Sequence, residues 1–304
     1  TSGIFVTNAG HMSISDYKHA ISQTDIGYSY TFPTEIKAKF LKELTKTTGF
    51  EKAYLVSTGA EAVEAAVKMM RIYTGKKKIV SFAGAMHGKT MLAETLRGDF
   101  EWADINTNFI HLPSPDFNSE FKDDVFKFLF TWTDQIAGII IESYRGWDAK
   151  FLPQRYIQEL LAWARRNKIL VCFDEIQAGI GRTGKLFAYE KYEISQPDLV
   201  CIGKGLGNGF PISAVLGRTD ILDKPKDLSS THSGSALGCA IALETLKKIK
   251  DKKLIKNAKK LHRFLGHWLC EIMDLSELIE YGSSHGLVAS VVFQTKEQAD
   301  KVCE

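Results

Sequence analysis

Two ionisable side chains each follow an apolar run that is typical of a buried strand. Asp174 comes directly after residues 169–173, and Lys204 comes directly after residues 199–203. A carboxylate at the end of a buried strand needs a nearby cation or strong donor, unless it caps a helix. A half-desolvated lysine has a lowered pKa and can act as a nucleophile or form a Schiff base. The alternative for Lys204 is a surface lysine in the glycine-rich turn 203–209.

A turn of small residues, 57–59, runs straight into a predicted helix over residues 60–73. The free N–H groups and the positive end of such a helix favour a bound phosphate. The same stretch also fits an ordinary helix start, with Thr58 as the N-cap and Glu61 completing a capping box. Either interpretation places a helix N-terminus here.

Taken together, the possible phosphate site at residues 57–60, the carboxylate of Asp174 and the amine of Lys204 point to one ligand. Pyridoxal 5′-phosphate has a phosphate for the helix end, a pyridinium nitrogen that an anion stabilises, and an aldehyde that condenses with an amine. The sequence therefore predicts a pyridoxal-phosphate site.

The elements that must position these side chains alternate between helix and strand. Apolar runs rich in β-branched residues predict strands, and amphipathic periodicity predicts helices between them. Strands that are apolar throughout imply a mostly parallel sheet sandwiched by helices, an α/β fold in which ligands bind at the carboxyl ends of the strands. The predicted strands are residues 78–82, 136–141, 169–173 and 199–202, and a further predicted helix spans residues 154–167.

Beyond about residue 235 the pattern changes to long, lysine-rich helices. A basic amphipathic helix can bind anionic surfaces, but these lysines fit the solvated face of a packed helix better. A strand over residues 287–293 suggests part of a small α+β domain. We expect an N-terminal segment over 1–32 that contributes to the substrate pocket, a large cofactor-binding domain over 33–240, and an incomplete small domain over 241–304. The chain begins with Thr1, so we expect a fragment.

Composition excludes several classes of protein. The chain has 304 residues, of which 44% are hydrophobic, and a net charge of +3. These values exclude a disordered or collagen-like chain and indicate neither a nucleic-acid nor a membrane partner. The five cysteines form no C-x-x-C pair and lie mostly in apolar runs, so we expect buried free thiols and a cytoplasmic protein.

Several long motifs resemble the class III aminotransferases, the ornithine, acetylornithine and 4-aminobutyrate types, which are fold type I enzymes that use pyridoxal phosphate. The similarity spans essentially the whole chain and begins at Thr1, in what looks like an early substrate-pocket segment. The motifs that carry it are STGAEAVEAAVKMMR (57–71), FDEIQAGIGRTGKLFAYEKY (173–192), PDLVCIGKGLGNGFPISAVLG (197–217) and STHSGSALGCAIAL (230–243).

The resemblance implies roles for individual residues. Lys204 would form the Schiff base with the cofactor and act as the general base. Asp174 would bind the pyridinium nitrogen, and Gln177 the 3-hydroxyl group of the ring. Glu142, which follows the run 136–141, matches a glutamate that the family keeps near cofactor and substrate.

The resemblance also implies a phosphate site shared between subunits. Gly59 and Ala60 would donate backbone N–H groups to the phosphate, and Thr231 would reach the phosphate of the neighbouring subunit in a homodimer. The implied reaction transfers an amino group from an amino acid or ω-amine donor to a 2-oxo acid acceptor.

Two departures from the family pattern concern the substrate side of the site. Met86 stands before His87, where the family usually has an aromatic residue stacked on the ring. Its sulfur can lie against the cofactor, while His87 is either a hydrogen-bonding partner behind the site or a structural histidine. Trp147 stands where many members have a glutamate that switches between substrates. Arg145 is either a carboxylate binder or a surface arginine.

Other functions remain open alongside amino transfer. An aminomutase or decarboxylase of the same fold would need no 2-oxo acid acceptor, and a non-catalytic relative would show no turnover. A nucleotide-binding oxidoreductase is disfavoured because the glycine-rich turn 203–209 follows a late strand and carries Lys204 at its start, unlike a dinucleotide fingerprint.

Overall fold

The computed structural model describes residues 4–29, 32–98, 108–115 and 123–303. Within them, seven strands form one sheet in the order β1-β7-β6-β5-β4-β2-β3. β7 pairs antiparallel with both of its neighbours, and the other pairs are parallel. This is the mostly parallel α/β sheet predicted from the strand pattern. The strands are β1 (Lys52–Val56), β2 (Lys78–Phe82), β3 (Phe109–Leu112), β4 (Ile136–Glu142), β5 (Leu170–Asp174), β6 (Leu199–Ile202) and β7 (Ser213–Gly217).

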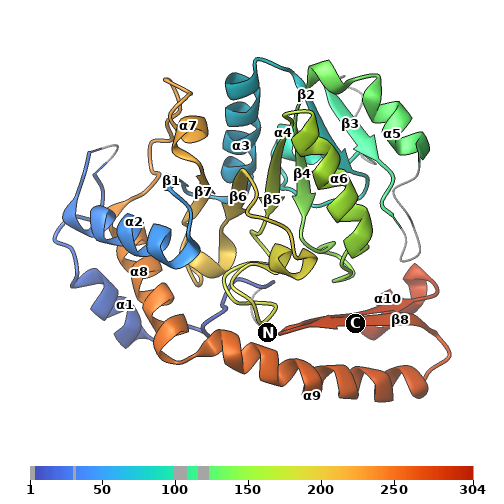
Figure 1. Cartoon of the computed structure of the whole chain (residues 1–304). Coiled ribbons are helices and arrows are strands. Elements are labelled where there is room, and N and C mark those ends of the chain that lie inside the picture. Colours follow the sequence, from blue (N-terminus) through green and yellow to red (C-terminus); the bar gives the residue numbers. More distant parts are fainter. Residues whose placement is uncertain (1–3, 30–31, 99–107, 116–122, 304) are drawn as a thin grey trace.

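Helices cover both faces of the sheet (Figure 1). α2 (Glu35–Thr48), α6 (Gln154–Arg166) and α8 (Ala236–Asp251) contribute to one buried apolar cluster, and α5 (Asp123–Phe130) adds Leu129 to it. α3 (Gly59–Thr74), α4 (Met91–Thr95) and α7 (Thr219–Leu222) contribute to the other. Alternate residues of β5 belong to alternate clusters, with Val171 in the first and Cys172 in the second. A strand buried on both faces has no polar side, which explains its uniformly apolar sequence.

The remaining elements lie outside the large sheet. α1 (Ile14–Ile21) packs on α8, while α9 (Leu254–Asp274) leads to the antiparallel hairpin β8 (Ile279–His285) and β9 (Val288–Phe293), followed by α10 (Lys296–Cys303). Figure 1 shows α9 running below the large sheet. The hairpin lies on the side of the sheet where the parallel strands have their carboxyl ends. Short 3₁₀ helices are η2 (Thr133–Gln135), η3 (Ala188–Tyr192) and η4 (Lys204–Leu206). The hairpin is joined to the body of the protein where Leu287 N–H donates to the Arg182 carbonyl (2.9 Å).

The cysteines follow the expectation from their apolar surroundings in part. Cys172, Cys201 and Cys239 are buried free thiols, whereas Cys270 and Cys303 are free but exposed. No helix in the described part of the chain is both long enough and apolar enough to span a lipid bilayer.

Candidate active site

The predicted site residues meet at the carboxyl ends of three neighbouring strands. Glu142 ends β4 and Asp174 ends β5, and the two residues are direct partners in the parallel register. Lys204 follows β6, which pairs with β5 on its other side. A cavity of about 690 Å³ opens above them and is lined by all three residues. The strand order therefore brings together groups that are far apart in the sequence.

Asp174 is buried and forms an ion pair with a buried histidine. His87 Nδ1 lies 2.8 Å from Asp174 Oδ2, and the N–H group of Ile176 donates to Asp174 Oδ1 at 3.0 Å. Burial lowers the pKa of His87, but the hydrogen bond and charge of Asp174, with a further contribution from Glu142, outweigh it, so the pKa lies above its ordinary value. Of the two sequence interpretations, the structure favours His87 as a hydrogen-bonding partner behind the site.

Glu142 accepts hydrogen bonds from two segments of backbone. The N–H group of Met86 donates to Oε2 (2.9 Å), and the N–H group of Gly146 donates to Oε1 (3.2 Å). Burial raises the pKa of Glu142 to about 7, against the opposing effects of His87 and of these donors. A carboxyl group with such a pKa can exchange a proton near neutral pH.

Lys204 lies in the first turn of η4 with a positive φ of 38°. Burial lowers the pKa of its amine, and the charges of Asp174 and Glu142 oppose this only in part. The unprotonated amine is the nucleophilic form of lysine. The geometry and the lowered pKa therefore both fit the role predicted from the sequence.

The start of α3 has the predicted capping box. Thr58 Oγ1 accepts from the N–H group of Glu61 (3.3 Å), and Glu61 Oε2 accepts from the N–H groups of Ser57 (3.0 Å) and Thr58 (2.7 Å). The next two residues, Gly59 and Ala60, line the cavity. The glutamate thus satisfies the N–H groups before the helix, and the residues at its first two positions line the cavity, where a helix N-terminus favours an anion.

Gln177 supplies an unpartnered polar atom at the cavity. Its Oε1 is buried and has no hydrogen-bond partner among the described residues, and the same holds for His87 Nε2. Gly146 lies close to the side chains of Gln177 and Glu142 and has no Cβ. A Cβ at this position would lie only 2.9 Å from Gln177 Oε1 and 3.0 Å from Glu142 Oε1, so glycine avoids a clash here. With the free helix end and Lys204, these features fit a pyridoxal phosphate with its ring beside Asp174 and its phosphate at the start of α3.

Met86 and Thr231 lie in different surroundings. Met86 lines the cavity with 43% of its surface exposed, as a residue beside a bound ring would. Thr231 is exposed and is not among the cavity-lining residues, and its carbonyl accepts a hydrogen bond from Tyr28 Oη (2.8 Å). Its neighbour Ser230 donates to Glu61 Oε1 at 2.8 Å, which ties this loop to the start of α3. One chain therefore brings together every predicted site residue except Thr231.

Arg145 is not a surface arginine, and that interpretation was wrong. Its side chain is 17% exposed and lines the cavity, with two nitrogens bonded to the carboxylate of Asp148. Asp148 could not be recognised from the sequence, because an aspartate three residues after an arginine carries no distinctive signal. Lys89, which directly follows Gly88, also lines the cavity and adds a cation that was not predicted.

The expected substrate-pocket segment at the start of the chain is described only in part. Thr1 to Gly3 lie outside the described residues, and Ile4 lines the cavity with 75% of its surface exposed. Among the described residues, no cluster of His, Cys, Asp or Glu could hold a metal ion.

Comparison with known proteins agrees with this geometry. The family model for Aminotransferase class-III matches residues 1–304. The acetylornithine aminotransferase of Clostridium acetobutylicum is 31% identical over 95% of this chain and 77% of its own length. The 5-aminovalerate aminotransferase of Pseudomonas aeruginosa is 32% identical over 98% of this chain and 74% of its own length.

Solved structures of transaminases share the fold. An S-selective transaminase from Bacillus megaterium has a TM-score of 0.86 at 25% identity, covering 98% of this chain and 73% of its own. The acetylornithine aminotransferase of Elizabethkingia anophelis has a TM-score of 0.83 at 25% identity, covering 99% of this chain and 76% of its own. The chain therefore belongs to the class-III aminotransferases, enzymes that transfer amino groups with pyridoxal phosphate.

Proposed function

We propose that Lys204, Asp174 and Glu142 form the catalytic centre for transfer of an amino group from an amino acid or ω-amine to a 2-oxo acid. The observation that supports this most directly is their convergence on one cavity from the ends of three adjacent strands. The start of α3, with Gly59 and Ala60, would hold the cofactor phosphate.

The remaining contacts orient the cofactor ring. Asp174, supported by His87, would lie beside the ring nitrogen as its anion. Gln177 Oε1, which is buried without a partner among the described residues, would bond the 3-hydroxyl group. Met86 would lie against the ring through its sulfur.

Pyridoxal phosphate, when bound, supplies an aldehyde that condenses with amines and a protonated ring that withdraws electrons. The lowered pKa of Lys204 favours the unprotonated amine, which is the form that would bind the cofactor covalently and, once released by the donor, would accept a proton from the substrate carbon. Burial excludes water from Asp174 and so would strengthen the interaction of its carboxylate with a protonated ring nitrogen. Glu142 holds the Met86 and Gly146 backbone in place at the substrate side.

The cavity also suits a substrate carboxylate. Lys89 lines the cavity, and its ammonium group can form a charge-assisted hydrogen bond with the carboxylate of a 2-oxo acid. Relatives include acetylornithine, 4-aminobutyrate and 5-aminovalerate aminotransferases. No observation favours an aminomutase, a decarboxylase, a nucleotide-binding oxidoreductase or a non-catalytic relative.

Amino transfer is tested by supplying the purified protein with pyridoxal phosphate, a panel of amino donors, and pyruvate or 2-oxoglutarate. We expect alanine or glutamate to form in equal amount to the oxidised donor. Product formation without consumption of the 2-oxo acid would indicate a mutase, and release of carbon dioxide a decarboxylase. Either result would contradict the proposal.

We further propose a homodimer in which Thr231 contacts the phosphate bound to the partner subunit. The support is that Thr231 is exposed and does not line the cavity of its own chain. The three buried free thiols support a reducing, cytoplasmic location.

A mixed-dimer experiment tests the role of Thr231. Thr231→Ala should weaken pyridoxal phosphate binding about tenfold, because a hydrogen bond to a charged phosphate is lost. Lys204→Ala should be inactive. In a dimer of one Thr231→Ala chain and one Lys204→Ala chain, the site with an intact Lys204 receives an intact Thr231 from its partner. We expect that site to bind cofactor with wild-type affinity, measured by titration of activity. An affinity as weak as that of the Thr231→Ala homodimer would place Thr231 in its own site.

A further inference from the structure

The loop after β4 forms one wall of the cavity and exposes an aromatic ring there. Trp147 lines the cavity and is 60% exposed. The guanidinium carbon of Arg145 lies 4.9 Å from the centre of its ring, a cation–π contact that fixes the ring on one side. The tryptophan is thus held in place while much of its surface remains open to a ligand.

The charge of Arg145 is already compensated. Arg145 Nε and Nη2 both bond to the carboxylate of Asp148, which has no exposed side-chain surface, and Nη1 donates to Ser114 Oγ (3.2 Å). Breaking such a pair would leave a buried charge uncompensated, which is strongly unfavourable. Arg145 is therefore committed to Asp148, and at Trp147 this wall offers a substrate an aromatic face beside a cation that is already paired.

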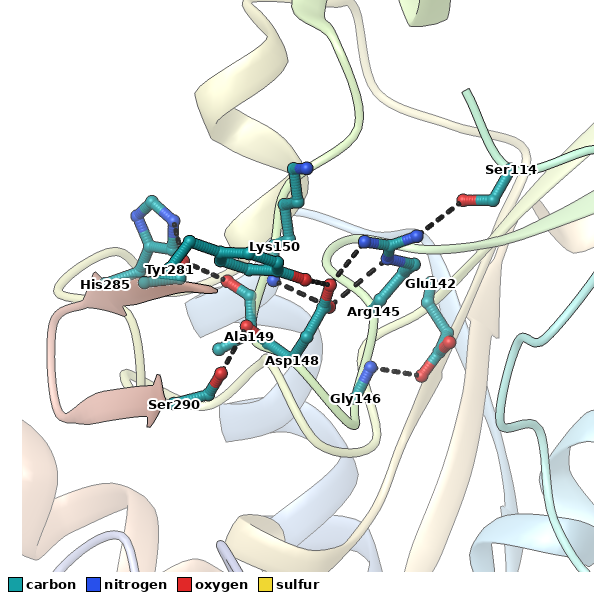
Figure 2. A network of polar contacts seen from close by, with 11 residues as sticks. Ser114, Glu142, Arg145, Gly146, Asp148, Ala149, Lys150, Tyr281, His285 and Ser290 are labelled. Atoms are coloured by element: carbon teal, nitrogen blue, oxygen red, sulfur yellow. Dashed lines mark hydrogen bonds and ion pairs between the residues drawn. The ribbon is translucent and has the colours of Figure 1, made fainter. Parts of the chain in front are cut away.

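The C-terminal hairpin secures the same loop (Figure 2). Tyr281 of β8 donates through Oη to Asp148 Oδ2 (2.7 Å), and Ser290 of β9 donates to the Asp148 carbonyl (2.8 Å). Burial and the bonded carboxylate of Asp148 raise the pKa of Tyr281 to about 12, so the phenol keeps its proton and donates throughout the neutral range. Asp148 thus connects the hairpin to the arginine that contacts the ring of Trp147.

Two further large apolar side chains face the same cavity while exposed. Met86 is 43% exposed and Ile4 is 75% exposed. Apolar surface gains about 25 cal/mol for each Å² that a ligand removes from water. A donor with an apolar or aromatic end can therefore gain affinity here, whereas a carboxylate beside Trp147 would meet an arginine that is already paired with Asp148.

We propose that Trp147 is the specificity-determining contact for an apolar or aromatic end of the amino donor, and that Asp148 and Tyr281 are positioning residues that hold it. The inference rests on the proposed amino-transfer function and names the donor class for the same site.

The test compares benzylamine, which has an aromatic ring and no carboxylate, with 4-aminobutyrate, both with pyruvate as acceptor. The wild type should use benzylamine with the higher kcat/KM. Trp147→Ala should lower kcat/KM for benzylamine about tenfold through KM, with kcat nearly unchanged, and should leave 4-aminobutyrate within about twofold. Trp147→Phe should restore most of the benzylamine affinity. Tyr281→Phe should raise KM for benzylamine about threefold, because only the bond to Asp148 is removed.

Trp268→Ala is the matched control, since Trp268 lies on α9, is 55% exposed and does not line the cavity. This substitution should leave kcat/KM unchanged for both donors. Equal losses for both donors in Trp147→Ala, or a wild type that uses 4-aminobutyrate but not benzylamine, would overturn the inference and leave amino transfer intact. Absence of both alanine from pyruvate and glutamate from 2-oxoglutarate, with every donor in the wild type, would overturn the proposed function as well.

Discussion

Replacing Lys204 with alanine is expected to lower kcat/KM for amino transfer by at least about 10⁴-fold, because one side chain supplies both the nucleophile and the base. Its amine lies at the end of β6 beside the cavity, and burial lowers its pKa. Lys204→Arg should fail as well, since a guanidinium stays protonated and does not condense with an aldehyde. Steady-state turnover with the donor panel measures both variants.

Chemical trapping separates loss of chemistry from loss of folding. Borohydride should fix the cofactor to wild-type protein on the peptide that contains Lys204, as peptide mass spectrometry would show. Lys191→Ala is the control, since burial also lowers the pKa of Lys191 but this residue does not line the cavity. It should retain both activity and trapping. A Lys204→Ala protein that still fixes cofactor with borohydride would disprove the assignment.

The second large effect is expected for Asp174→Asn, which should reduce kcat about 10³-fold while pyridoxal phosphate still binds. The amide keeps the size of the side chain but removes the anion that favours a protonated ring nitrogen. Turnover at saturating donor measures kcat, and the absorbance spectrum of the bound cofactor shows whether its ring remains protonated.

Asp174→Asn should also change how stability depends on pH. In the wild type, the raised pKa of His87 means that its pairing with Asp174 contributes fully below the ordinary value of 6.5 and is lost as pH rises through the folded-state pKa. The variant should lack this contribution, as urea unfolding at several pH values would show.

Glu175→Gln is the matched control for Asp174. Glu175 is buried next to Asp174 but bonds to Ser143 Oγ and to the N–H groups of Ala188 and Tyr189, and it does not line the cavity. It should lower stability and leave kcat nearly unchanged. If Asp174→Asn turned over at the wild-type rate, the carboxylate would have no role at the ring nitrogen.

Much of the large sheet could be predicted because its strands are buried on both faces. The run 136–141 corresponds to β4, and Lys78–Phe82 was predicted with the bounds that β2 has. An ionisable residue directly after an apolar run can be recognised from a few neighbouring residues. Asp174 and Lys204 could therefore be identified from the strands that precede them. β1 and β7 were not identified, because antiparallel pairing of Lys52–Val56 with Ser213–Gly217 joins segments far apart in the chain.

The contacts between the loop after β4 and the C-terminal hairpin could not be predicted for the same reason. Asp148 and Tyr281 are separated by 133 residues and belong to a loop and a hairpin. The residues next to each of them in the sequence do not indicate that the two side chains are in contact. The surface interpretation of Arg145 stayed open in the sequence because its partner Asp148 is recognised as buried only once the hairpin covers it.

The pairing of Glu142 with Asp174 across β4 and β5 has a consequence for redesign of this enzyme. The strand register fixes the backbone positions of these two residues, and substitutions at Trp147 and Tyr281 leave that register unchanged. Trp147, by contrast, depends on one buried aspartate and a hairpin tyrosine. Mutational libraries at Trp147 and Tyr281 can therefore explore new amines while Glu142 and Asp174 keep their places, provided that Gly146 is retained, because a Cβ there would lie 3.0 Å from Glu142 Oε1.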